Sequence, residues 1–88
     1  MRKKHADTLK SIFHKPVLSN VKWSDVEALF GHLGAHVEEG RGSRIRVFLN
    51  ERVSVFHRPY PRKETDKGAL NSVREFLEAA GITPQEEL

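Results

Sequence analysis

Hydrophobic residues in the first third of the chain recur at the spacing of a helix. Near the N-terminus, Leu9, Ile12 and Phe13 are three and four residues apart, which predicts one short helix in an otherwise polar segment. A longer stripe at this spacing follows within residues 23–33, and its members are Trp23, Val26, Leu29, Phe30 and Leu33. Because glycine is a natural C-terminal stop, we expect the second helix to end at Gly34.

The middle of the chain, residues 35–57, changes to the alternation that is typical of β-strands. The apolar residues that alternate with other types are Ile45, Val47, Leu49, Val53 and Val55. Glycines at 40 and 42 and the Asn-Glu pair at 50–51 separate the apolar segments and indicate two hairpin turns. We therefore expect an antiparallel meander with strands at residues 35–39, 43–49 and 52–57.

A third helical stripe follows a basic loop at residues 58–65 that contains two prolines. Its members are Leu70, Val73, Phe76, Leu77 and Ala80. Thr65 or Asp66 can cap this helix at its start, and Gly81 can end it near residue 80. The order helix–helix–strand–strand–strand–helix predicts an α+β fold, in which helices cover one face of a three-stranded antiparallel sheet.

The alternation also assigns side chains to the two faces of the sheet. We expect Ile45, Val47 and Leu49 to face the helices. The opposite face is expected to carry Arg44, Arg46, Phe48, Ser54 and Phe56, with Arg58 at its edge. The expected core consists of Trp23, Val26, Leu33, Ile45, Val47, Val55, Leu70, Val73 and Leu77.

The chain has 88 residues and no cysteine, which favours one domain without disulfides or a thiolate zinc site. We place the domain at residues 20–82, with an N-terminal extension at 1–19 and a tail at 83–88. No apolar core follows the basic N-terminus as it does in an export signal, and no apolar run approaches the roughly 20 residues that span a bilayer. We therefore expect a cytoplasmic protein.

The charge is unevenly distributed around a net value of +3. Residues 41–67 hold eight Lys or Arg and three Asp or Glu, and they include the expected strands at 43–49 and 52–57. Such a basic block suits a polyanionic partner, although an ordinary solvated surface has the same composition.

His57 closes the last expected strand and stands beside the basic loop. An imidazole titrates near neutral pH, so it can give or take a proton. Cleavage of RNA requires a group that deprotonates a 2′-hydroxyl and cations that hold the phosphate. The residues that can supply these functions are His57, Arg44, Arg46, Arg58 and Lys67. The alternative is a histidine that hydrogen-bonds the loop backbone and only positions the turn.

Arg44 and Arg46 alternate on one strand, so their guanidinium groups can contact phosphates from the same face. The alternative is a face kept in solution by its charge. Phe48 and Phe56 among these arginines suit base stacking or a protein interface, or else they are buried in a two-sided core.

Other catalytic classes lack their residues. The chain has no cysteine nucleophile, no GxSxG elbow and no GxxxxGK[ST] phosphate loop. His32 and His36 have the spacing of two ligands on a helix, but Gly34 should break the helix between them. We therefore expect neither a metal nor another cofactor.

Three short motifs together resemble those of the HicA toxin family. Gly-Ser at residues 42–43 opens a strand, a histidine stands before Pro59, and Lys-Gly-Ala-Leu at residues 67–70 begins the last helix. The family's motifs are a Gly-Ser-His on a strand, a histidine–proline segment and a Lys-Gly-Thr-Leu helix start. Residues 23–34 also look like the family's first helix with its glycine turn, so the resemblance covers about residues 20–82.

This resemblance implies a double-stranded-RNA-binding-like fold, a toxin that cleaves mRNA, and a HicB-like antitoxin as partner. Activity in the family depends on the histidine of Gly-Ser-His, and Arg44 stands at that position here. Arginine stays protonated and is a poor general base, but it can bind phosphate. We therefore assign proton transfer to His57 and phosphate contact to the basic residues. The alternatives are a non-catalytic RNA-binding module and a domain that docks a protein through its open sheet face.

Overall fold

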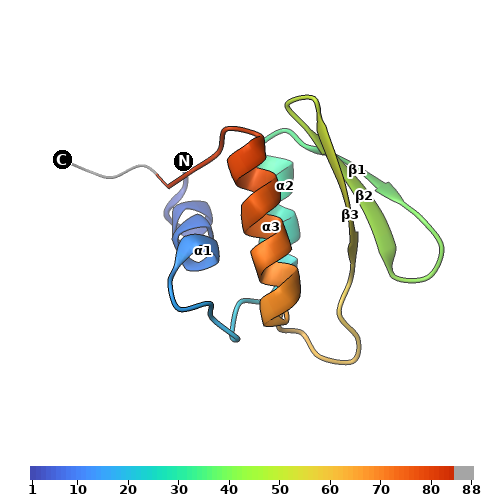
Figure 1. Ribbon diagram of the computed structural model, residues 1–88, viewed down its shortest axis with the longest axis horizontal. Coiled ribbons are helices and arrows are strands. Elements are labelled where there is room, and N and C mark those ends of the chain that lie inside the picture. The colour runs from blue at the N-terminus through green and yellow to red at the C-terminus, as the bar shows by residue number, and fades with distance from the viewer. Residues whose placement is uncertain (85–88) are drawn as a thin grey trace.

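The computed structural model describes residues 1–84 and has the α+β architecture that the sequence predicts (Figure 1). Its elements are α1 (Lys3–Phe13), α2 (Trp23–His32), β1 (His36–Glu39), β2 (Arg44–Leu49), β3 (Arg52–His57) and α3 (Lys67–Ala79). Helix α1 begins earlier than its apolar spacing indicates, and a Lys3–Asp7 ion pair at 3.0 Å bridges its first turn. Most of the expected tail, residues 85–88, lies outside the described residues.

The three strands form one antiparallel sheet in the order β1-β2-β3. All three helices lie on one side of this sheet, and its other face is open (Figure 1). Helices α2 and α3 lie next to the sheet, and α1 packs on their outer side, where Leu9 and Ile12 become buried. Within residues 1–84, no helix is both long and apolar enough to cross a membrane.

The core forms between the sheet and the helices, as expected from the apolar stripes. Seven of the nine expected core residues are at most 5% exposed, namely Trp23, Val26, Ile45, Val47, Leu70, Val73 and Leu77. Four aromatic rings meet at its centre, where Phe30 lies 5.8 Å from Phe56 and 6.1 Å from Phe76 between ring centroids, and Trp23 lies 6.5 Å away. Leu33 is only partly buried against this cluster.

The face assignment of β3 was wrong, and the turn before it explains why. Asn50 and Glu51 both have positive φ, 49° and 65°, as a two-residue hairpin turn of this twist requires. The turn therefore pairs Leu49 with Arg52, and every later pair follows from that register. Directly paired residues share a face, so Phe56 joins Ile45 in the core and Val55 turns outward, 48% exposed.

Candidate nucleic-acid interface

The open face of the sheet brings Arg44 and His57 together. They are direct cross-strand partners at the first residue of β2 and the last residue of β3, and both are exposed. Side chains of direct partners start about 4.5–5.5 Å apart at Cβ, so this imidazole and this guanidinium can reach the same bound group. The sequence indicated both residues separately, and the register places them side by side.

Arg46 and Phe48 continue this face along β2. Phe48 is half-buried and lies beside the His36 ring of β1, with 5.8 Å between the ring centroids. Arg46 is 59% exposed and reaches Glu38 at 4.0 Å, a separation at which a surface ion pair contributes little. Arg44 makes no ion pair within residues 1–84, so its charge is available to a ligand.

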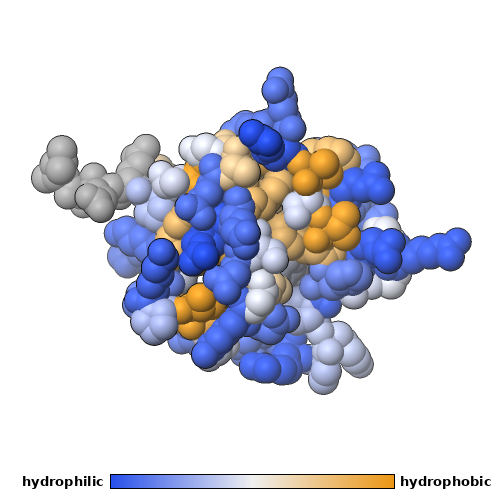
Figure 2. Space-filling model, in the orientation of Figure 1, coloured by the Kyte–Doolittle hydropathy of each residue, from blue (hydrophilic) through white to orange (hydrophobic). Residues whose placement is uncertain are grey.

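Apolar side chains complete the open face at its β3 edge. Val53 pairs with Phe48 and is 56% exposed, and Val55 pairs with Arg46. Figure 2 shows hydrophobic residues at the surface over the strands, among hydrophilic ones. The open face thus combines cations, the Phe48 ring and exposed valines, and the sequence did not indicate the valines.

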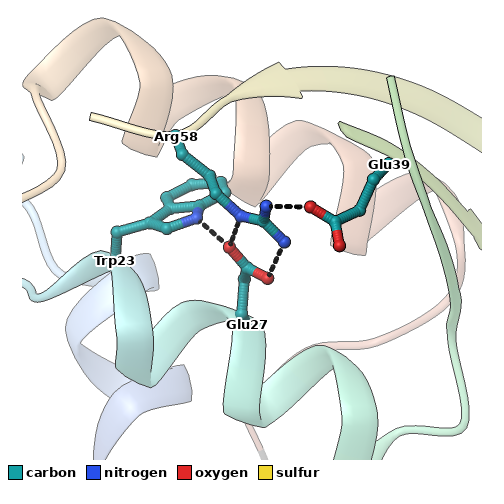
Figure 3. A network of polar contacts seen from close by, with 4 residues as sticks. All are labelled: Trp23, Glu27, Glu39 and Arg58. Atoms are coloured by element: carbon teal, nitrogen blue, oxygen red, sulfur yellow. Dashed lines mark hydrogen bonds and ion pairs between the residues drawn. The ribbon is translucent and has the colours of Figure 1, made fainter. Parts of the chain in front are cut away.

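Arg58 turns away from the open face, contrary to the expected position beside Arg44. Its Nε donates to Glu27 Oε2 at 2.7 Å and its Nη2 donates to Glu27 Oε1 at 3.0 Å. Arg58 therefore makes a bidentate contact with the Glu27 carboxylate on α2 (Figure 3). Its Nη1 donates to Glu39 Oε1 at 2.6 Å, at the end of β1. The Trp23 indole N–H also donates to Glu27, so four side chains form one network.

The network shifts the pKa values of Glu27 and Arg58. Hydrogen bonds from Arg58 lower the pKa of Glu27, and burial opposes that shift without reversing it. The same bonds, with Glu27 contributing most and Glu39 next, raise the pKa of Arg58. Both groups are therefore ionised near neutral pH, and the two carboxylates leave this cluster with a net charge of −1.

Lys67 begins α3 at the same end of the molecule at which β3 stops (Figure 1). Asp66 caps the helix, as one of the two expected caps, by accepting a hydrogen bond from Ala69 N at 2.7 Å. The loop between β3 and α3 is anchored beside the start of α2, since Thr65 N donates to Val21 O at 2.7 Å. Lys67 itself is exposed and begins α3 two residues after this anchored position.

The arrangement can hold an anion and move a proton beside it. Arg44 supplies a guanidinium that can bind an anion, and His57 supplies an imidazole, the side chain most often used for proton transfer. Among residues 1–84, no cluster of three or more His, Asp or Glu side chains is placed to hold a metal ion. Sequence reasoning missed the two carboxylates that engage Arg58, because they come from two other elements and no spacing rule connects them.

Comparison with known proteins identifies one family. The family model described as HicA toxin of bacterial toxin-antitoxin matches residues 23–82, from the start of α2 to just past the end of α3. The matched segment covers more than two thirds of the chain and leaves α1 outside it. No curated protein and no solved structure gave a significant match.

Proposed function

The chain belongs to the HicA family of toxins from bacterial toxin–antitoxin systems, and we propose that it cleaves mRNA in the cytoplasm without a metal ion. The observation that supports this activity best is the direct pairing of Arg44 with His57 on the open face. A proton acceptor beside a phosphate-binding cation is the minimum that cleavage by a 2′-hydroxyl requires. A HicB-like antitoxin is the proposed partner.

In the proposed reaction, His57 accepts the proton of a ribose 2′-hydroxyl. The 2′-oxygen then bonds to the adjacent phosphorus, the bond from phosphorus to the 5′-oxygen breaks, and that oxygen takes up a proton from water as it leaves. Arg44 stabilises the negative charge that grows on the non-bridging oxygens. Since Arg44 stands where the family's Gly-Ser-His motif has histidine, proton transfer in this chain rests on His57.

Arg46 and Lys67 extend the proposed phosphate contacts on either side of this pair. Each phosphate contact releases bound counterions, so RNA affinity should fall steeply as salt rises. We also expect Phe48, on the same face, to stack on a base of single-stranded RNA.

Replacing Arg44 or Arg46 with alanine should weaken RNA binding to a similar degree across sequences and reduce the salt slope by about 1. Affinity measured at several salt concentrations by fluorescence anisotropy tests this expectation. Arg2→Ala is the matched control, because Arg2 precedes α1 on the side of the helices away from the sheet (Figure 1). Equal salt slopes for Arg44→Ala, Arg46→Ala and wild type would contradict these contacts.

A second function of the same face has its own support. The exposed Val53 and Val55 add apolar surface that plays no part in contacts with RNA phosphates. Exposed apolar surface of this kind suits a protein partner. Binding that is insensitive to salt would favour protein docking as the main role. RNA binding without product would favour a non-catalytic RNA-binding module.

A further inference from the structure

Arg58 ties together three segments at the point where β3 leaves the sheet. Its backbone N–H donates to Ser43 O at 2.8 Å, next to the first residue of β2. Its side chain holds α2 through Glu27 and the end of β1 through Glu39, 31 and 19 residues away in sequence. His57 is the preceding residue, so these contacts fix the backbone that carries it.

The geometry at Glu27 is that of a structural clamp. Both of its oxygens accept from the planar guanidinium, which is the geometrically specific form of this pair. Trp23, itself only 5% exposed, donates to one of the same oxygens and restricts the carboxylate further. The Glu27 side chain is 25% exposed, so solvent screens this pair less than a surface pair.

The same contacts make Arg58 a poor phosphate ligand. All three of its guanidinium nitrogens already donate to carboxylates. The cluster also carries one more negative than positive charge, and that excess repels a phosphate. Removing the Arg58 charge would leave two carboxylates uncompensated beside the proposed RNA surface.

We propose that Arg58 is a positioning residue, which holds His57 opposite Arg44 by clamping Glu27 and Glu39 and which does not itself contact RNA. This inference rests on the proposed function for its catalytic consequence. The clamp itself is a property of the free protein and is testable without RNA.

The test in the free protein compares ring resonances of His57 in wild type and in Arg58→Lys by NMR. Lysine keeps the charge but lacks the planar fork, so the His57 signals should shift or broaden. The signals of His14, which follows α1 and lies outside the clamped segments, should stay in place. Glu39→Gln, a change at an exposed carboxylate, provides a milder variant should Arg58→Lys fail to fold. Unchanged His57 signals in these folded variants would overturn the clamp.

The test with RNA separates a clamp from a phosphate contact. Arg58→Met should weaken RNA binding, and adding Glu27→Gln and Glu39→Gln should restore affinity to within about twofold with an unchanged salt slope. Arg58→Lys should lower kcat by about tenfold to a hundredfold with little change in KM, since misplacing a reacting group by about 1 Å costs up to that much. A triple variant whose salt slope stays reduced by about 1 would show that Arg58 contacts a phosphate and would overturn the proposal. Wild type that binds no RNA at low salt would refute the proposed function, while the NMR comparison still decides the clamp.

Discussion

Replacing His57 with alanine is expected to lower the rate of RNA cleavage by about 10²–10⁴-fold, the usual loss when a general acid or base is removed. His57 is exposed on the open face, so the substitution creates no cavity and the fold should persist. Arg44 remains in place, so much of the RNA affinity should persist as well. Single-turnover cleavage of a labelled RNA, together with a binding isotherm, measures both quantities.

His36→Ala is the matched control for this loss, because His36 lies on the same face at the opposite edge strand. Its cleavage rate should stay close to that of wild type. Arg44→His restores the residue of the family motif and should raise activity, since an imidazole would then lie directly opposite His57. Cleavage by His57→Ala at the rate of wild type would refute the role assigned to His57.

Replacing Phe30 with alanine is expected to lower the free energy of unfolding by about 3–5 kcal/mol, the usual cost of emptying a buried phenylalanine site. Phe30 is 0% exposed and lies against the rings of Phe56 and Phe76. Those rings come from β3 and α3, so the cavity would open between the helix layer and the sheet. Small domains have a total stability of about 5–15 kcal/mol, so much of this variant should be unfolded under mild denaturation.

Urea denaturation followed by circular dichroism measures the Phe30→Ala effect. Tyr60→Ala is the matched control, because Tyr60 is 92% exposed in the loop after β3. Surface substitutions of this kind change stability by about 0.5 kcal/mol or less. A Phe30→Ala protein with the unfolding midpoint of wild type would contradict the packing of the aromatic cluster.

Local patterns predicted the elements of this fold but not every face. Helical spacing located α2 and α3 within one residue at each end, and alternation located the strands. The orientation of β3 depended on the conformation of Asn50 and Glu51, which periodicity does not report. Asn50 is held in the turn by its own contact, since its Nδ2 donates to Ala80 O at 2.8 Å at the end of α3. That tertiary hydrogen bond joins residues 30 apart in sequence.

Local sequence patterns also indicated only part of the candidate site, because some of its contacts join residues that are distant in sequence. Strand alternation was enough to put Arg44 and Arg46 on one face, and the position of His57 at a strand end was visible in the sequence. The role of Arg58 was not visible, because its partners Glu27 and Glu39 lie on other elements and approach it only in the folded chain. A count of positive charges treats Arg58 and Arg44 alike. In the folded chain, two carboxylates compensate the charge of Arg58, whereas Arg44 makes no ion pair within residues 1–84.

End-group analysis of RNA that has been incubated with the purified protein in excess chelator tests the central proposal most directly. Attack by the 2′-hydroxyl leaves a 2′,3′-cyclic phosphate on one fragment and a free 5′-hydroxyl on the other. We expect these ends from the wild-type protein without any added metal, and no fragments from His57→Ala at matched times. Fragments that form only when a divalent metal is added, or that carry 3′-hydroxyl and 5′-phosphate ends, would contradict metal-independent cleavage with His57 as the base.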